Sequence, residues 1–301
     1  MKIKGIITAM VTPLNKSGKG INEEATRKLV NKLIDAGVHG LFILGTNGEF
    51  YSLNEDEKIE LARIVVDEVN GRVPVFAGSG GISTEAVINL TNKFTKLGVD
   101  AVSVITPYLM KLNDEEIINH YRNIIQNTDI PIILYNIPAN TNLNISERVF
   151  SELIKFEQVI GIKDSGGDIE NTKRYMKLNN RPLDFSILIG SDSLILSALK
   201  LGADGAVAAT SNVLTNTDLG IYSSFIEGDL SKAHNLQESI NEFRRCLKFA
   251  TVPSVLKYSV NLAGIDVGEP KLPVLTVSQK YHDEIKEIVS KYKNIEEIEG
   301  I

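Results

Sequence analysis

Short apolar runs recur along the chain, and amphipathic segments separate them. Most of these runs are rich in Val, Ile and Leu with little alternation, as is typical of strands buried on both faces of a parallel sheet. The eight runs cover residues 5–11, 40–45, 73–77, 101–106, 130–135, 159–162, 185–189 and 205–209. Eight evenly spaced strand-and-helix units predict an α/β fold, a closed (β/α)8 TIM barrel, rather than a doubly wound open sheet.

The segments between the runs carry signals for the starts and ends of helices. Asn22 precedes two glutamates, which suits a helix N-terminus, and Gly37 is placed to end the same helix. Asn54 and Asn113 are each followed three residues later by a glutamate, as in a capping box. These signals predict a helix after each of the corresponding strands.

From about residue 219 onward the pattern is helical, with helices predicted over 230–249 and 278–293. We therefore expect residues 1–218 to form the barrel and residues 219–301 to form a helical C-terminal extension packed on it. No Pro/Gly/Ser-rich linker separates the two regions. The last nine residues, 293–301, are expected to be a frayed end.

The composition fits a globular protein with a barrel of this kind. The chain has 301 residues, 43% hydrophobic and 23% charged, and its net charge of −6 argues against a nucleic-acid or anionic-membrane partner. No apolar stretch approaches the ~18 residues of a membrane span, and the N-terminus does not resemble a signal peptide. The one cysteine, Cys246, is expected to be a packing residue. These features favour a cytoplasmic location.

Lys163 lies at the carboxyl end of the sixth apolar run. Burial there disfavours the charged ammonium, and a neutral amine is a nucleophile. A nucleophilic lysine suits an enzyme that forms a Schiff base with a carbonyl substrate. From this fragment alone, the alternative is a lysine whose ammonium reaches solvent from the strand end.

The other strand ends supply partners for this lysine, because barrel enzymes build their sites at the carboxyl ends of the strands. Thr46 and the amides of the 45–48 turn are placed to hold a carboxylate, and Tyr135 is placed to transfer protons. The alternatives are a purely structural turn and a core tyrosine. The glycine-rich segment 78–84 fails the dinucleotide fingerprint and is predicted to be a cap and turn.

A metal site is not predicted. Asp164 and Asp168 are the carboxylates nearest the lysine in sequence, but the four histidines are scattered and none has ligand-like spacing to them. We expect Asp164 to organise the loop after the sixth strand.

Four motifs at four strand ends carry a resemblance to a known family. They are Gly45-Thr46-Asn47-Gly48-Glu49, Tyr135-Asn136-Ile137-Pro138, Gly161-Ile162-Lys163-Asp164, and Gly205-Ala206-Val207 with Asn212. With them the chain resembles, over nearly its whole length, the dihydrodipicolinate synthase / N-acetylneuraminate lyase family of pyruvate-dependent class I aldolases. The resemblance implies a (β/α)8 barrel with a helical C-terminal part, and usually a homotetramer built from dimers.

The resemblance also implies a carbon–carbon lyase in which pyruvate is bound as a Schiff base on Lys163. Tyr135 would be the proton-transfer residue, and Thr46 its hydroxyl relay. The pyruvate carboxylate would meet Thr46 and Asn47, beside the Val207 backbone. No metal or organic cofactor is implied, and the partners are small molecules: pyruvate and an aldehyde.

The sequence departs from the lysine-pathway synthase of this family at two positions. Where that synthase has an arginine for the carboxylate of aspartate semialdehyde, this chain has Asn140, and an amide does not replace a bidentate arginine. Where the synthase has a tyrosine pair, the second reaching into the neighbouring subunit, this chain has Tyr108-Leu109. Both differences fit an aldehyde without a carboxylate.

N-acetylneuraminate lyase acts on such an aldehyde, but one member of its strand-seven acidic pair is missing, since Asp192 is followed by Ser193. Its strand-eight serine corresponds to Ala209. The sugar-acid aldolases, which split 2-keto-3-deoxygluconate or a relative into pyruvate and glyceraldehyde, have a strand-seven Gly-Ser-Asp that resembles residues 190–192 here. The chain is therefore closest in motif to 2-keto-3-deoxy sugar-acid aldolases.

We accordingly expect reversible cleavage of a 2-keto-3-deoxy sugar acid such as 2-keto-3-deoxygluconate. The candidate contacts for the aldehyde part are Tyr108, Asn140, Ser165, Asp192 and Ser211. The alternatives are 4-hydroxy-tetrahydrodipicolinate synthase, which condenses pyruvate with aspartate semialdehyde, and N-acetylneuraminate lyase. A non-catalytic regulatory protein on this scaffold and a dinucleotide-dependent oxidoreductase are disfavoured, the first because lysine and tyrosine are both present, the second because the fingerprint is absent.

Overall fold

The computed structural model describes residues 1–16 and 18–298, and within them eight parallel strands form a closed barrel in chain order from β1 to β8. The strands are β1 (Gly5–Ala9), β2 (Gly40–Ile43), β3 (Val75–Gly78), β4 (Ala101–Ile105), β5 (Ile132–Asn136), β6 (Val159–Asp164), β7 (Ser186–Ile189) and β8 (Gly205–Ala208). The predicted barrel is confirmed, and the ends of each predicted strand differ from these by no more than two residues.

Helices follow the strands as the local signals predict. Those between β1 and β8 are α1 (Glu23–Ala36), α2 (Glu55–Val69), α3 (Thr84–Leu97), α4 (Asp114–Gln126), α5 (Pro138–Thr141), α6 (Glu147–Leu153), α7 (Ile169–Leu178) and α8 (Ile195–Leu201), with a 3₁₀ turn η1 (Asp192–Leu194). Asn22 caps α1 by accepting from Ala25 N, and Gly37 ends it in the left-handed conformation. The capping boxes at Asn54 and Asn113 are both confirmed.

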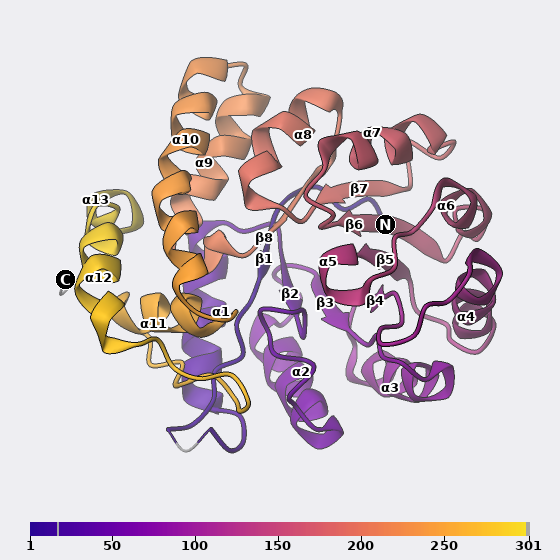
Figure 1. Cartoon of the computed structure of the whole chain (residues 1–301), viewed down its shortest axis with the longest axis horizontal. Coiled ribbons are helices and arrows are strands. Elements are labelled where there is room, and N and C mark those ends of the chain that lie inside the picture. Colours follow the sequence, from indigo (N-terminus) through magenta and orange to yellow (C-terminus); the bar gives the residue numbers. More distant parts are fainter. Residues whose placement is uncertain (17, 299–301) are drawn as a thin grey trace. The chain divides into compact units, whose positions relative to one another are not determined.

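The chain after β8 is helical. It contains η2 (Thr210–Asn212), α9 (Thr215–Ile226), α10 (Leu230–Cys246), η3 (Leu247–Phe249), α11 (Ser254–Leu262), η4 (Gln279–Tyr281), α12 (His282–Ser290) and α13 (Lys293–Glu296). Helices α9 and α10 lie side by side, in orange in Figure 1. Of the part of the chain that the structure describes, no helix is both long and apolar enough to cross a bilayer.

Tertiary contacts group the chain into two compact units. The first comprises Met1–Gly5 and Phe76–Val207, and the second comprises Ile6–Val75 and Ala208–Ile301. The first unit contains β4 to β7 entire, with every residue of β4, β5, β6 and β7 buried, as strands covered on both faces require. The expected boundary between a barrel over 1–218 and a helical region over 219–301 stays a prediction.

The C-terminal segment packs through Glu296, so the expectation of a frayed end is wrong for residues 293–298; residues 299–301 lie outside the described residues. The Glu296 carboxylate accepts from Asn216 N, Thr217 N and Thr217 Oγ1 at 2.6–2.9 Å. These donors belong to the first turn of α9, where unpaired N–H groups and the helix dipole favour an anion. Burial raises the pKa of Glu296, against these hydrogen bonds.

Cys246 confirms its expected packing role. It is buried at the end of α10, with Sγ lying 2.9 Å from Phe243 O. Burial raises the pKa of its thiol to about 12, which keeps it protonated and unreactive at neutral pH.

His120 provides a pH-dependent element of stability in the first unit. Its ring is 5% exposed on α4; Nδ1 lies 2.8 Å from Thr84 Oγ1, and Nε2 has no hydrogen-bond partner among the described residues. Burial therefore lowers the pKa of His120 from 6.5 to about 4. Because the folded-state pKa is the lower one, the unfolded chain binds the proton first, and stability is lost as pH falls from about 6.5 towards about 4.

We predict that His120→Gln removes part of this acid sensitivity. Between pH 7 and pH 4, the free energy of unfolding of the parent should fall by up to about 3 kcal/mol more than that of the variant. Urea unfolding followed at a series of pH values measures the difference. Parallel pH dependence of the two proteins would contradict the prediction.

Candidate active site

Tyr135 and Lys163 face each other across adjacent strands of the first unit. The register of β5 and β6 pairs them directly, and both are buried, with 4% and 3% of their surfaces exposed. Lys163 Nζ lies 4.3 Å from the centroid of the Tyr135 ring. The structure thus brings together the two residues that the sequence predicts as nucleophile and proton-transfer group.

Asp164 fixes the strand ends that carry these two residues. Its carboxylate accepts from Asn136 Nδ2 at 3.0 Å, from Gly166 N at 3.1 Å, from Asn171 Nδ2 at 3.1 and 3.2 Å, and from Thr172 Oγ1 at 2.7 Å. The Asn136 side chain in turn accepts from Ile145 N at 2.9 Å. The expectation that Asp164 organises the loop after the sixth strand is confirmed.

Gly190, at the end of β7, leaves the space that the lysine side chain occupies. A Cβ at this position would lie 2.0 Å from Ser165 Oγ and 3.1 Å from Lys163 Cε. Gly190 N donates to Asp164 O at 2.7 Å, and Ser165 N donates to Asn136 O at 2.8 Å. This steric role of Gly190 is not predictable from the sequence, where the only local signal is a glycine directly after an apolar strand.

The loops after β4 and β5 carry the next predicted residues. Tyr108 is half-buried, and burial raises its pKa. Leu109 is 84% exposed with φ of +77°, a strained backbone for leucine. Asn140 is exposed on α5, and that short helix is tied to the end of β4 by a 3.0 Å hydrogen bond between Thr106 Oγ1 and Thr141 Oγ1.

Two further predicted residues lie at the ends of β7 and β8. Asp192 is 7% exposed and begins η1, directly after the strand-seven end. Val207 is a buried residue of β8. Their expected contacts with substrate stay predictions.

The remaining predicted residues belong to the second unit. Thr46 and Asn47 are half-buried in the turn after β2. Ser211 is fully buried, with Oγ 2.9 Å from Ala208 O and 3.0 Å from Thr8 Oγ1. These hydrogen bonds give Ser211 a structural role, whereas its expected contact with substrate stays a prediction.

Asn212 has a structural role that sequence reasoning missed. Its Oδ1 accepts from Val11 N at 3.0 Å, and its Nδ2 donates to Ala9 O and Ala209 O, each at 2.8 Å. The side chain thereby replaces backbone partners at the end of β1. An asparagine shortly after an apolar strand is the only local signal, and two of its three partners lie about 200 residues earlier in the chain.

The carboxylates near the lysine are occupied by protein donors. Asp168 caps α7 by accepting from Glu170 N at 2.9 Å, and Asp164 is bonded as described above. Among residues 1–16 and 18–298, no group of three His, Cys, Asp or Glu side chains is placed to hold a metal ion.

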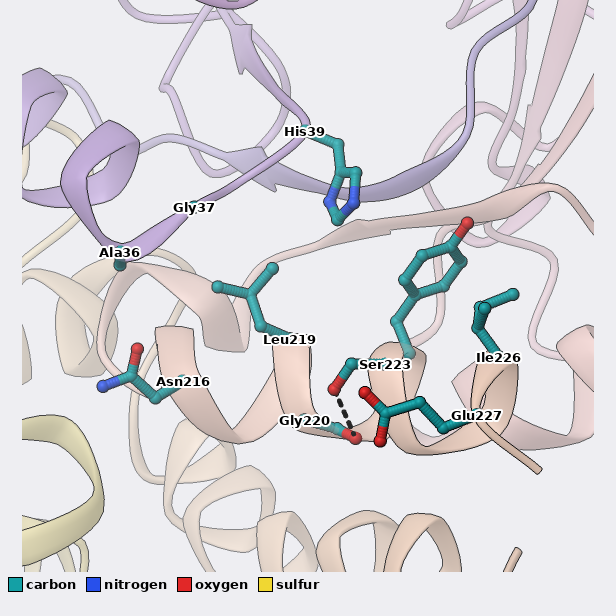
Figure 2. A pocket seen from close by; sticks show the side chains of 10 residues that line it. Ala36, Gly37, His39, Asn216, Leu219, Gly220, Ser223, Ile226 and Glu227 are labelled. Atoms are coloured by element: carbon teal, nitrogen blue, oxygen red, sulfur yellow. Dashed lines mark hydrogen bonds between the residues drawn. The ribbon is translucent and has the colours of Figure 1, made fainter. Parts of the chain in front are cut away.

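A surface pocket of about 510 Å³ lies elsewhere in the second unit, between the end of α1 and α9. Figure 2 shows His39 pointing towards the α9 residues that line it. His39 Nδ1 accepts from Ile6 N at 3.2 Å, and burial lowers its pKa. His39 directly precedes β2, at its amino end, whereas barrel sites form at the carboxyl ends of strands. This pocket is therefore not the candidate active site.

The closed (β/α)8 barrel has a buried lysine beside a tyrosine at its strand ends. This arrangement is the one expected of a Schiff-base carbon–carbon lyase. The sequence profile of the Dihydrodipicolinate synthetase family matches residues 2–292. The chain belongs to this family, whose members are pyruvate-dependent class I aldolases, and it is an enzyme of the carbon–carbon lyase type.

Individual relatives support the same family. The 4-hydroxy-tetrahydrodipicolinate synthase 1 of Halalkalibacterium halodurans is 34% identical over 278 residues, covering 92% of this chain and 93% of that protein. The crystal structure of dihydrodipicolinate synthase DapA-2 from Bacillus anthracis superposes with a TM-score of 0.92 at 35% identity, over 96% of this chain and 98% of that one. The prophage protein YagE from E. coli K12, solved in complex with pyruvate, gives a TM-score of 0.92 at 27% identity over 96% and 98% of the two chains.

We predict that Gly190→Ala lowers turnover by at least about tenfold, because the new methyl group displaces Ser165 and crowds the Lys163 side chain. Steady-state kinetics with pyruvate and an accepted aldehyde measure the effect. Gly81→Ala is the matched control, since its Cβ would meet only Val87 Cγ2 at an ordinary 3.6 Å. Parental turnover in Gly190→Ala would show that the space beside Lys163 is not needed.

Proposed function

We propose that Lys163 forms a Schiff base with pyruvate and that Tyr135 transfers the protons of the reaction. The observation that carries this proposal is the position of the lysine Nζ over the tyrosine ring, with both side chains buried on adjacent strands. A lysine amine in this position can attack the carbonyl carbon of a keto acid and form a Schiff base. Family membership supports the same chemistry.

In the cleavage direction, the Lys163 amine adds to the C2 ketone of a 2-keto acid. Proton transfers through Tyr135 release water from the carbinolamine and leave an iminium ion. Tyr135, acting as base, then takes the proton of the C4 hydroxyl. The C3–C4 bond breaks, its electron pair enters the iminium to form an enamine, and the aldehyde leaves. Protonation of the enamine at C3 and addition of water release pyruvate and restore the lysine.

The carboxylate of pyruvate needs donors of its own. We assign them to the Thr46 hydroxyl and the amides at Thr46 and Asn47, with the Val207 backbone alongside. Successive backbone N–H groups in a turn form a nest that favours an anion. Thr46 also serves as the hydroxyl relay of Tyr135 in this proposal.

For the aldehyde part, we propose that the enzyme cleaves a 2-keto-3-deoxy sugar acid such as 2-keto-3-deoxygluconate to pyruvate and glyceraldehyde. The segment 136–144, which follows Tyr135, contains neither arginine nor lysine, so it offers no side-chain cation to a second carboxylate. Tyr108, Asn140, Ser165, Asp192 and Ser211 are the proposed contacts for the sugar hydroxyl groups.

A second candidate is 4-hydroxy-tetrahydrodipicolinate synthase, with aspartate semialdehyde as the aldehyde. The observation in its favour is that relatives at 34% and 35% identity over more than nine-tenths of this chain bear that name. N-acetylneuraminate lyase activity has less support, because Ser193 follows Asp192 where that enzyme has a second acid. In either case we propose a cytoplasmic homotetramer built from dimers.

We predict that borohydride with pyruvate traps a covalent adduct on Lys163, and that Lys163→Ala abolishes it. Tyr135→Phe should still form the adduct but turn over about 100- to 10,000-fold more slowly, because a positioned acid/base is lost. Mass spectrometry of the trapped protein and steady-state rates measure the two effects separately. Adduct formation on Lys163→Ala would remove Lys163 from the mechanism, and an unchanged rate in Tyr135→Phe would remove Tyr135.

A competition between two aldehydes tests the proposed aldehyde substrate. Purified protein given pyruvate with equal concentrations of D-glyceraldehyde and aspartate semialdehyde should form the glyceraldehyde product with the higher kcat/KM. Replacing Asn140 by arginine should shift the ratio towards aspartate semialdehyde, because a guanidinium pairs with its carboxylate. A preference for aspartate semialdehyde in the parent protein would establish the second candidate instead.

A further inference from the structure

Glu49 forms a fully buried ion pair in the second unit. Its Oε2 accepts from Lys257 Nζ at 3.0 Å, and the exposed side-chain fractions are 0% for Glu49 and 1% for Lys257. Two backbone groups complete the site: Lys257 Nζ donates to Glu269 O at 2.7 Å, and Lys271 N donates to Glu49 Oε1 at 2.6 Å. Three separate segments, namely the turn after β2, α11 and residues 269–271, therefore meet at this ion pair.

Burying the Glu49–Lys257 pair costs free energy, because both charged groups lose their contact with water. Removing two charges from water costs several kcal/mol per ion, and their attraction repays this only with good geometry and added hydrogen bonds. Desolvation lowers the pKa of Lys257, and the Glu49 carboxylate opposes that shift. Replacing a buried ion pair by apolar side chains of similar volume is often neutral or stabilising, so a gain in stability does not by itself account for this pair.

The carboxylate anchors the turn that contains Thr46 and Asn47. Within this turn Gly48 N donates to Gly45 O at 3.0 Å, and Glu49 N donates to Thr46 O at 3.2 Å. Glu49 itself has φ of +58°, a conformation that costs free energy for a residue with a side chain. The Glu49 side chain is buried, whereas Thr46 and Asn47 are half-buried. The turn is therefore held at Glu49, and Thr46 and Asn47 stay accessible to a ligand.

We infer that Glu49 and Lys257 are positioning residues: their ion pair holds the 45–49 turn against α11 and residues 269–271, so that Thr46 and Asn47 present a fixed set of donors to the pyruvate carboxylate. This inference rests on the proposed function. It gives a part of the C-terminal helical region, 208 positions away in the chain, a role in binding the keto acid.

The inference is tested with Glu49→Gln, Lys257→Met and the double variant, which removes both charges at nearly constant volume. The readouts are the melting temperature, the pyruvate concentration that half-saturates borohydride trapping, and the amount trapped at saturation. Lys2→Met is the matched control, because Lys2 pairs with Asp204 at 2.7 Å with 18% and 15% of the side chains exposed, in the other unit. Each variant is assayed on its folded fraction after size-exclusion chromatography.

All three Glu49 and Lys257 variants are expected to need at least about tenfold more pyruvate for half-saturation, with the amount trapped at saturation unchanged. The double variant should melt higher than either single variant, because no unpaired charge stays buried, and yet keep the raised half-saturation. Lys2→Met should melt lower than the parent and keep the parental half-saturation. This separation distinguishes positioning from a loss of stability.

The outcomes separate the inference from the proposed function. If the parent protein traps no pyruvate, the proposed function fails and the inference fails with it. If the parent traps pyruvate and the folded variants half-saturate at the parental concentration, only the inference is overturned. Should the single variants not fold, the double variant decides in the same way, since parental half-saturation in the neutral pair would show that no anchor is needed.

Discussion

The arrangement of the candidate site depends on one buried carboxylate, that of Asp164. Five hydrogen bonds from neutral donors occupy its two oxygens, and they come from β5, from the loop after β6 and from α7. Asp164 and its register partner Asn136 are each one residue beyond Lys163 and Tyr135. Because successive strand residues point to opposite faces, the hydrogen-bonded pair and the lysine–tyrosine pair lie on opposite sides of the same two strand ends. The residues that hold the strand ends, Asp164 and Asn136, are thus the immediate chain neighbours of the proposed reactive residues.

Glu49 is a second buried carboxylate, and its charge is compensated differently. Asp164 is surrounded by amides, a hydroxyl and a backbone N–H, whereas Glu49 has a lysine ammonium and one backbone N–H. Neutral donors suffice for Asp164 because its partners on β5, on the loop after β6 and on α7 lie within hydrogen-bond distance of the carboxylate. The Glu49 turn is joined instead to distant segments, and a long lysine side chain on α11 spans that gap. On the proposed mechanism, both carboxylates lie next to residues that contact the keto acid. Neither carboxylate takes part in the reaction itself.

Much of this structure was predictable because its determinants are local. The strands follow from unbroken apolar runs, and the starts of α1, α2 and α4 follow from an asparagine cap within three residues of its partner. Helix α5 was missed, since it has no side-chain cap hydrogen bond and is only four residues long. Helix α11 lies in the region predicted to be helical, but its bounds were not predicted, and it too has no side-chain cap hydrogen bond. The docking of Glu296 onto α9 was also missed, because its partners lie about 80 residues earlier.

In the candidate site too, features with local determinants were predictable, and features that depend on distant contacts were not. Lys163 and Tyr135 were predictable because each ends an apolar strand, and parallel strands end at the same edge of a barrel. The steric role of Gly190 and the Glu49–Lys257 pair were not, because both depend on contacts between elements whose register no local pattern specifies. Tertiary contacts between segments far apart in the chain are the features that a single sequence predicts least well.

The same distinction bears on the choice of aldehyde. Strand ends, tight turns and core positions are the parts of a fold where packing tolerates few changes. On the proposed mechanism these are the parts that handle pyruvate. The proposed aldehyde contacts include an exposed asparagine on the four-residue α5 and a half-buried tyrosine beside the strained, exposed Leu109. Surface loops of this kind change without cost to the barrel, so an identity of 34% to a named synthase constrains the keto-acid half of the reaction more strongly than the aldehyde half.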